Sequence, residues 1–453
     1  MLPLGEALNF DFDPTQALRR WPAEVPVVLL HSGRFHSEWS RYSLIARPTG
    51  ALVFRDGRSR WIGEPAGVDG WRDDPFADLE AAVAGDPGAF YVGQLGYDLG
   101  RRVEVLPELA ADDHGWPELQ FQRCAGGYLF DHAEARWWRV GQGDAELPDL
   151  DHPPAAAEPS YRVASVGPDR SRQQHEAAVE RGLEYIAAGD VFQVNLAQRF
   201  TGTFEGDTRS LYLALARKSP AWYGCYLEML DAVPGGSAAA RGRHVMVGTS
   251  PELFLDLRAD GGVVTRPIKG TRPAGVDPHT LRDSAKDTAE LNMIVDLLRN
   301  DLGRVCDYGS VRVLEARHIE SHPTVHHGVA TVAGRLRPAA SLADLLRATF
   351  PGGSVTGAPK VRAMQIIEEL EACRRGPYCG AAGLITQVQG RPVMRLNLTI
   401  RTLLVDRRKR RVQFSVGGGI VADSDPAEEY DETLDKAAAL IAALGAGESK
   451  PPE

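Results

Sequence analysis

The segment best suited to chemistry is Thr265–Thr271, which reads T-R-P-I-K-G-T and contains Lys269. The isoleucine and glycine beside this lysine indicate a strand end with other backbone close by, where an ammonium group is partly desolvated and its pKa falls. A lysine with a lowered pKa is a nucleophile. A single lysine in apolar surroundings is more often a surface residue whose stem covers apolar atoms. The interpretation therefore depends on the segments that accompany it.

Two acidic pairs have the spacing of metal-binding helix faces. Asp287 and Glu290 lie three residues apart on a predicted helix and so share a face. Glu429 and Glu432 repeat this spacing on a second helix, which has Pro426 at its predicted first position. If the two pairs converged they would repel each other unless a hard cation lay between them, and Mg²⁺ accepts such oxygen ligands. The alternative is that each pair is a solvated helix surface.

Two glycine-containing segments are suited to hold an anion. Gly417, Gly418 and Gly419 end a predicted strand, where backbone N–H groups can approach an anion closely. Thr356–Lys360 opens a predicted helix, whose N-terminus carries positive partial charge. Its lysine does not directly follow its glycine, so a nucleotide-binding P-loop is excluded. Arg401, on another predicted strand, can form two parallel hydrogen bonds with a carboxylate, although a surface arginine is the alternative.

Glu252 and two histidines complete the titratable candidates. Glu252 follows Ser250-Pro251, and a partly buried carboxyl near another carboxylate stays protonated near pH 7, which makes it a candidate proton donor. Such a triplet also commonly caps a helix or turn. His326 and His327 are adjacent, so on a strand they point to opposite faces and cannot chelate one metal together. One buried structural and one exposed histidine is the alternative for this pair.

The composition limits the classes of protein. The chain has 453 residues, 43% of them hydrophobic, and can bury a large core as one or two domains. Its net charge of -10 argues against a nucleic-acid surface, which needs a positive field. No apolar run approaches the roughly 18 residues that span a bilayer, and no export signal is visible. The five cysteines are scattered and odd in number, which favours reduced thiols and a cytoplasmic location.

Composition and periodicity also suggest an organisation. We expect an N-terminal region over 1–141, a Pro-, Ala- and acid-rich linker or surface loop over 142–170, a catalytic region over 171–446 and a frayed tail over 447–453. The patterns predict helices and strands. The predicted helices cover 172–188, 342–349 and 359–370, and the predicted strands cover 25–30, 42–46, 191–200, 394–405 and 411–416, the last two as a pair.

Nine segments together resemble the chorismate-utilising enzymes, and within that family aminodeoxychorismate synthase component I. In order along the chain they are residues 192–199 (F-Q-V-N-L-A-Q-R), 250–252 (S-P-E), 267–271 (P-I-K-G-T), 287–290 (D-T-A-E), 295–301 (V-D-L-L-R-N-D), 356–360 (T-G-A-P-K), 400–402 (I-R-T), 417–423 (G-G-G-I-V-A-D) and 430–433 (Y-D-E-T). The resemblance implies an α+β (mixed α/β) fold. Two interleaved subdomains would pack antiparallel sheets together and carry helices on the outside.

The resemblance also implies roles for particular residues. It assigns Lys269 as the nucleophile and Glu252 as the proton donor. Glu290 and Glu432 would bind Mg²⁺, with Asp287 and Glu429 as helpers that act through water or the second coordination sphere. The residues that would contact chorismate are Thr271, His327, Thr356, Tyr378, Arg401, Gly417, Gly418, Gly419 and Lys436.

Two positions separate the branches of this family. Relatives that add water to chorismate, the isochorismate and salicylate synthases, carry a lysine base where this chain has Gln193, and glutamine cannot deprotonate water. Anthranilate synthase component I typically has alanine where this chain has Lys269. The resemblance therefore implies amination of chorismate to 4-amino-4-deoxychorismate through a lysine adduct at ring carbon C2, a step toward 4-aminobenzoate and folate. Anthranilate synthesis and a non-catalytic regulatory homologue are the alternatives.

The resemblance implies a partner and a second ligand. The chain has no nucleophilic cysteine in a G-x-C-x-G setting, so a separate glutamine amidotransferase subunit is expected to supply ammonia. Ser32, Ser40 and Arg41 fall in segments that resemble the place where relatives bind tryptophan. A sheet-edge turn with no ligand is the alternative there.

Overall fold

The computed structural model describes residues 4–63, 70–143, 145–152, 160–232, 239–321 and 325–445. The predicted tail at 447–453 and part of the predicted linker lie outside these ranges. No helix in the described part of the chain is long and apolar enough to cross a membrane.

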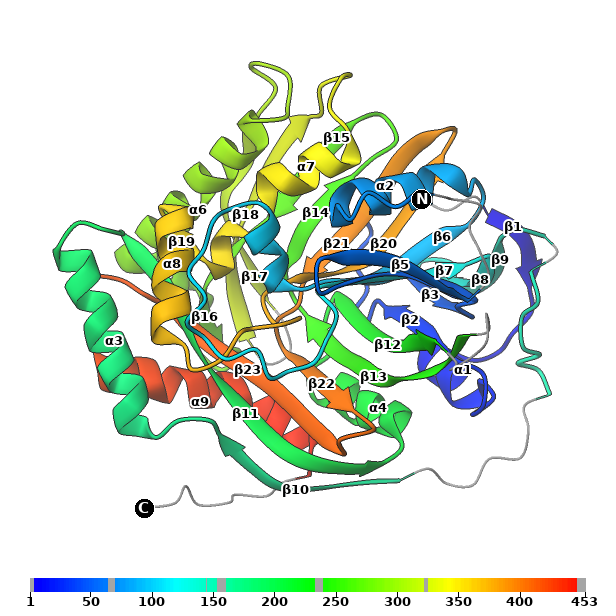
Figure 1. Cartoon of the computed structure of the whole chain (residues 1–453), viewed down its shortest axis with the longest axis horizontal. Coiled ribbons are helices and arrows are strands. Elements are labelled where there is room, and N and C mark those ends of the chain that lie inside the picture. The colour runs from blue at the N-terminus through cyan, green and yellow to red at the C-terminus, as the bar shows by residue number, and fades with distance from the viewer. Residues whose placement is uncertain are drawn as a thin grey trace.

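Two antiparallel sheets form the centre of the molecule (Figure 1). The strands of sheet one are β1 (Leu4–Leu8), β2 (Val28–His31), β3 (Tyr42–Ala46), β8 (Gly126–Asp131), β9 (Arg136–Gly141), β10 (Tyr161–Pro168), β11 (Gln193–Gly206), β12 (Tyr223–Ala232), β13 (Ala239–Ser250), β19 (Gly357–Ala358), β22 (Thr402–Asp406) and β23 (Arg411–Ile420). Their order is β1-β9-β8-β3-β2-β12-β13-β22-β23-β11-β10, and β19 pairs with β11.

Sheet two takes its strands from both halves of the chain as well. They are β4 (Gly50–Arg55), β5 (Arg58–Gly63), β6 (Phe90–Leu95), β7 (Leu119–Cys124), β14 (Leu253–Leu257), β15 (Gly262–Arg266), β16 (Ile268–Pro273), β17 (Arg312–Ser321), β18 (Val325–Arg335), β20 (Ala381–Val388) and β21 (Arg391–Leu398). Their order is β16-β18-β15-β14-β21-β20-β6-β7-β4-β5, and β17 pairs with β18.

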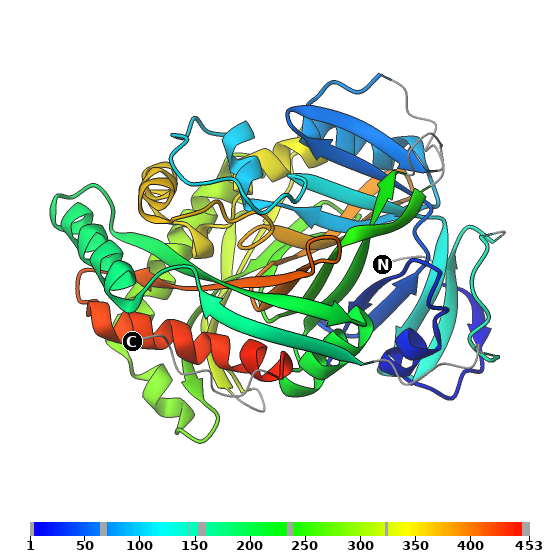
Figure 2. The same cartoon turned by 60° about the horizontal axis from the view of Figure 1, so that its bottom comes forward.

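Helices cover the outer sides of the two sheets. They are α1 (Pro14–Arg20), α2 (Pro75–Gly85), η1 (Tyr97–Arg102), α3 (Arg172–Ala187), α4 (Thr208–Lys218), α5 (Pro278–Arg282), α6 (Ala285–Gly303), α7 (Leu342–Thr349), η2 (Gly353–Val355), α8 (Lys360–Leu370) and α9 (Pro426–Ala443). Helix α9 runs along sheet one beside β23 (Figure 2), whereas α6 packs against β16 and β18 of sheet two.

The sheets face each other across a shared apolar layer. Val28 and Leu227 of sheet one pack with Phe90, Val92 and other buried side chains of sheet two. Burial of such side chains supplies most of the driving force for folding. The predicted α+β architecture of packed antiparallel sheets with outer helices is confirmed.

Several predicted elements agree with the structure, and their termini explain why. The predicted helix at 342–349 is α7, and the predicted strand at 42–46 is β3. The helix predicted at 172–188 is α3, which begins with a capping box between Ser171 and Gln174. Gly189 follows its end with a φ of 81°, a conformation that glycine adopts without strain.

Two predictions were wrong in part. The single strand predicted over 394–405 is broken at Arg401, whose φ is 50°. Its first half belongs to β21 in sheet two and its second half to β22 in sheet one, so only β22 pairs with the strand that follows. In the predicted linker, residues 161–168 form β10 beside β11, and Leu150 is fully buried.

Candidate active site

Lys269 lies on an edge strand of sheet two and reaches toward sheet one. The register of β16 against β18 shifts between Ile268 and Thr271, and such a bulge turns a side chain away from the regular alternation. A Cβ placed on Gly419, in β23 of sheet one, would lie 2.9 Å from the Lys269 Nζ. The amine therefore ends between the two sheets.

The surroundings of Lys269 lower the pKa of its ammonium group. The side chain is half-buried, and desolvation lowers its pKa, with the Lys436 ammonium adding to this effect. The carboxylates of Glu290, Glu252 and Glu432 act in the opposite direction, but the net pKa is lowered. A neutral amine at the centre of a carboxylate-lined site can act as a nucleophile.

Glu252 is the group best placed to carry a proton. It is 4% exposed and accepts a hydrogen bond of 2.6 Å from the Ser354 hydroxyl. Burial raises its pKa to about 7, although the Ser354 hydrogen bond and Lys269 lower it somewhat. The cause is desolvation and not a neighbouring carboxylate, which corrects the physical reason expected from sequence. Sequence reasoning missed Ser354 because nothing in its spacing marks a contact with Glu252.

The glycines of β23 leave space for larger side chains around them. A Cβ on Gly419 would lie 2.4 Å from the Gln193 Nε2, and one on Gly418 would lie 2.8 Å from the Glu429 Oε2. Gln193 is fully buried, and within the described residues neither its amide nitrogen nor its amide oxygen has a hydrogen-bond partner. Because buried polar atoms are nearly always paired in native proteins, Gln193 marks a place where a ligand is expected.

The four predicted metal-site carboxylates come from α6 and α9, and three of them have protein partners. Asp287 accepts a hydrogen bond from Arg272 at 2.8 Å, and Glu429 accepts one from Ser424 at 2.6 Å. Glu432 forms an ion pair of 2.6 Å with Lys436, while its side chain stays 53% exposed.

The pKa values of the carboxylates on α6 and α9 depend on one another. Burial and the nearby Asp287 and Glu432 raise the pKa of Glu290, although Lys269 lowers it. Burial, and then the neighbouring Glu432, raise the pKa of Glu429. Burial also opposes ionisation of Glu432, but Lys436 lowers its net pKa. Carboxylates that repel one another across a shared space suit a hard divalent cation.

The acidic group offers a magnesium ion few protein ligands. Among the described residues, no three His, Cys, Asp or Glu side chains are grouped closely enough to hold a metal by themselves. Mg²⁺ is commonly held by only one or two carboxylates, with water and an anionic substrate completing its shell. Glu290 and Glu432 would be enough protein ligands for such an ion, and their role in binding Mg²⁺ stays a prediction.

The two adjacent histidines have separate partners. The His327 Nδ1 lies 2.9 Å from the Thr271 hydroxyl, directly across the pair of strands β16 and β18. His326 turns to the other face, where its ring contacts Ser321 and the Ala274 carbonyl. Both histidines are buried, so the alternative of one exposed histidine does not hold.

The remaining predicted substrate residues differ in whether their polar groups already have partners within the protein. Arg401 is half-buried and makes no ion pair with any described residue, and burial lowers its pKa. Its guanidinium is thus available to a carboxylate. The Thr356 hydroxyl instead donates to the carbonyls of Gly352 and Gly353, and Lys436 donates to the Gly417 carbonyl at 2.8 Å. Tyr378 is buried.

The predicted tryptophan residues lie elsewhere, around β2 and β3. The Ser32 hydroxyl donates to the Tyr42 carbonyl, the Ser40 hydroxyl to Trp222, and Arg41 pairs with Asp131. A cavity of about 790 Å³ beside α1 and α4 is lined by Ser32 but not by Ser40 or Arg41. Tryptophan binding stays a prediction.

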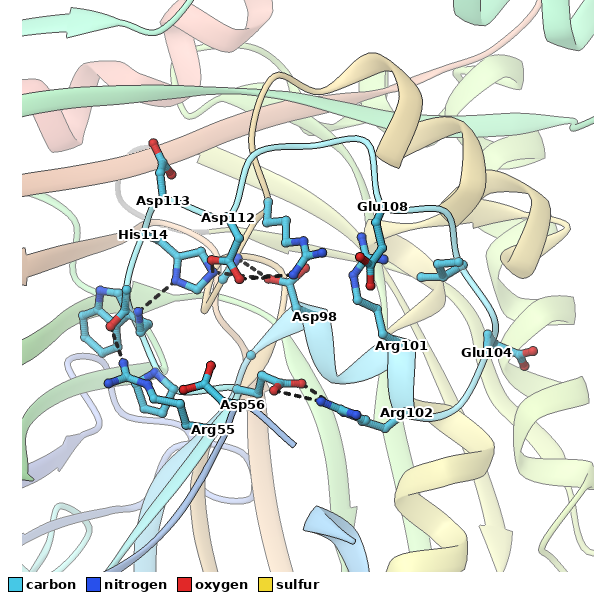
Figure 3. A pocket seen from close by; sticks show the side chains of 18 of the residues that line it. Arg55, Asp56, Asp98, Arg101, Arg102, Glu104, Glu108, Asp112, Asp113 and His114 are labelled. Carbon is cyan, nitrogen blue, oxygen red and sulfur yellow. Dashed lines mark hydrogen bonds and ion pairs between the residues drawn. The ribbon is translucent and has the colours of Figure 1, made fainter. Parts of the chain in front are cut away.

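A larger cavity of about 950 Å³ lies away from the predicted catalytic residues. Figure 3 shows its charged lining, which includes Asp98, Arg101 and His114 on and after η1. Its acidic and basic groups are largely paired with each other; for example, Arg102 bonds to Glu118. None of the residues predicted to bind chorismate or metal lines this cavity.

The arrangement combines a half-buried amine, a buried carboxyl with a raised pKa, a half-buried arginine and a group of carboxylates, and comparison with known proteins identifies its class. Residues 40–442 match the chorismate binding enzymes, and the chain belongs to this family.

Similar proteins come from two branches of this family. The chain is 36% identical to aminodeoxychorismate synthase component 1 of Klebsiella aerogenes over 95% of each chain. It is 40% identical to anthranilate synthase component 1 of Thermus thermophilus over 79% of this chain and 78% of the other. Anthranilate synthase component I from Streptococcus pneumoniae TIGR4 superposes with a TM-score of 0.73 at 27% identity, covering 97% and 100% of the two chains. The resemblance inferred from the nine segments is confirmed.

Proposed function

We propose that this chain converts chorismate and ammonia to 4-amino-4-deoxychorismate through a covalent adduct with Lys269. The observation that carries the proposal is the pairing of two perturbed groups in one site. A lysine with a lowered pKa lies within electrostatic reach of Glu252, whose pKa is about 7. Both shifts favour the reactive form, because a lowered pKa increases the neutral fraction of the amine and a raised pKa increases the protonated fraction of the acid.

The site residues suggest how chorismate is held. Arg401 would bind a substrate carboxylate through two parallel hydrogen bonds, and the backbone of Gly417–Gly419 would approach the ring closely. The buried amide of Gln193 would find its missing partner in the reacting molecules. Glu290 and Glu432 would hold Mg²⁺, which when bound neutralises charge on a substrate carboxylate.

The chemistry then follows as two displacements. The neutral Lys269 amine forms a bond to ring carbon C2, the ring double bond shifts, and the C4 hydroxyl leaves as water with a proton from Glu252. The proton released by the new secondary amine restores Glu252. Ammonia next forms a bond at C4, the double bond shifts back, and the bond between C2 and the Lys269 nitrogen breaks. Glu252 donates a proton to the departing Lys269 nitrogen and takes up the proton that the new C4 ammonium releases, so Lys269 leaves as a free amine. The enolpyruvyl group is retained throughout.

The alternatives differ at Lys269. Direct attack of ammonia at C2 would lead to anthranilate, and the Thermus thermophilus relative is named anthranilate synthase component 1. In this chain the Lys269 amine extends toward Gly419, and in the proposed reaction it takes the place of ammonia at C2. A non-catalytic homologue would be expected to lack the acid, the lysine or an acidic ligand, and this chain retains all three.

Ammonia would come from a separate glutamine amidotransferase. The relatives that carry the aminodeoxychorismate synthase name are themselves called component 1, and this chain has no recognisable glutaminase segment. The product would serve as a precursor of 4-aminobenzoate and folate.

One incubation separates these functions. Purified protein is mixed with chorismate, Mg²⁺ and an ammonium salt, and the products are identified by mass and by the position of the new nitrogen. We expect 4-amino-4-deoxychorismate. Anthranilate would support the alternative enzyme, and unchanged chorismate would support a regulatory homologue.

A further inference from the structure

Arg375 is a buried arginine behind the candidate active site with no assigned role. It is 5% exposed, and its guanidinium uses all three nitrogens. Nε and Nη2 donate to the two oxygens of Glu371 at 2.9 and 2.6 Å. Nη1 donates to the Val355 carbonyl and Nη2 to the Asn195 carbonyl, each at 2.8 Å.

Each contact ties Arg375 to a segment that carries a candidate active-site residue. Val355 precedes Thr356, and Asn195 lies two residues after Gln193 on the same face of β11. The third segment is the turn in which the Tyr378 backbone N–H donates to the Arg375 carbonyl at 3.2 Å. The guanidinium thus joins two walls of the site, and the Arg375 backbone joins the third.

Three further contacts surround this junction. Glu371 holds Arg375 and also accepts a hydrogen bond from the Ala197 backbone at 2.9 Å. The guanidinium lies 4.6 Å from the ring centre of Tyr97 and 5.9 Å from that of Tyr378. A planar group with five donors can satisfy such a fork, whereas a lysine ammonium cannot.

We propose that Arg375 is a positioning residue that fixes β11, the Thr356 turn and Tyr378 relative to one another, without itself touching chorismate. The proposal rests on the proposed function. A misplacement of about 1 Å in a reacting site can lower the rate roughly 100-fold. Loss of the fork should therefore act on kcat and on the chorismate KM, and not only on the amount of folded protein.

The test compares Arg375→Lys and Arg375→Ala with Arg374→Ala, all with ammonium as nitrogen source. Arg374 is the matched control, because its neighbouring guanidinium pairs with Asp112, which is exposed. The concentration of folded enzyme is measured in each sample by near-UV circular dichroism, so that kinetic constants refer to folded molecules.

We expect both Arg375 variants to lose roughly 100-fold in kcat/KM for chorismate, with a raised KM, while Arg374→Ala stays within about threefold of wild type. Guanidinium at millimolar concentration should restore part of the activity of Arg375→Ala, and sodium chloride at equal concentration should not. If Arg375→Ala does not fold, the Arg375→Lys constants decide the question.

Unchanged kcat and KM per folded molecule in Arg375→Lys would overturn the proposal and leave Arg375 with a structural role only. The product of the wild-type enzyme, identified in the same assay, reports separately on the proposed function. A fall in chorismate consumption in the Arg375 variants therefore tests the role of Arg375 whichever product the enzyme forms.

Discussion

Replacing Glu252 with glutamine should remove the catalytic acid and make the protein more stable at alkaline pH. Burial raises the pKa of Glu252 from 4.5 to about 7. At roughly 1.4 kcal/mol for each pKa unit, ionising this carboxyl in the folded protein costs about 3 kcal/mol more than in the unfolded chain. Glutamine keeps an oxygen to accept the Ser354 hydrogen bond but never ionises.

The direction of the pH dependence follows from the raised pKa. Below about 4.5 the carboxyl is protonated in both states, and the wild type carries no penalty. Between about 4.5 and 7 the unfolded chain ionises this carboxyl while the folded protein keeps it protonated, so the stability of the wild type relative to Glu252→Gln falls. Above about 7 the folded protein ionises it too, and the difference stops growing. Urea unfolding of both proteins at several pH values between 5 and 9 isolates this residue, since all other groups are common to both.

We expect the stability difference to grow toward about 3 kcal/mol in favour of Glu252→Gln and to level off above pH 8. Activity with ammonium should fall by a factor of roughly 100 to 10,000. A stability difference that does not change with pH, or a glutamine variant with near wild-type activity, would refute the assignment of Glu252 as the acid.

Three other outcomes are expected. Lys269→Ala should abolish amination at C4 while chorismate binding stays near normal, as measured by product mass and by equilibrium titration; a trace of C2-aminated product would fit the space that the lysine vacates. Glu290→Gln and Glu432→Gln should raise the Mg²⁺ concentration needed for half-maximal activity, whereas Glu428→Gln, at an exposed position of α9, should not; an equal metal response in all three would reduce the acidic pairs to helix surface. The isolated chain should use ammonium, increasingly so as pH rises and frees ammonia, but should use glutamine only when an amidotransferase is added. Turnover with glutamine alone would reveal an amide-hydrolysing site in this chain.

The sequence was most informative where short segments resemble a known family and where capping residues mark the start of a helix. Lys269, Glu290 and Glu432 were predicted from short segments, and the structure brings them into one electrostatic group. Helices were predicted well where the sequence contains a residue that caps the helix N-terminus, as at Ser171 before α3. Both kinds of prediction depend only on residues that are neighbours in the sequence.

Contacts between distant segments could not be predicted. Ser354 meets Glu252 across 102 positions of sequence, and Arg375 meets Asn195 across 180. The break at Arg401 also escaped notice, because a left-handed backbone angle at a residue other than glycine leaves no pattern in hydrophobicity. β10 was not predicted because the sequence shows only its composition. Its pairing with β11 is a contact between two segments, which the composition does not reveal.

Trapping the lysine adduct tests whether Lys269 forms a covalent bond to chorismate. Enzyme and chorismate are mixed with Mg²⁺ in the absence of ammonia, quenched in acid, digested and analysed by mass spectrometry. We expect a modification on Lys269 with the mass of chorismate less one water, which disappears when ammonia is added before the quench. An unmodified Lys269 under these conditions, together with C4 amination once ammonia is supplied, would contradict this expectation.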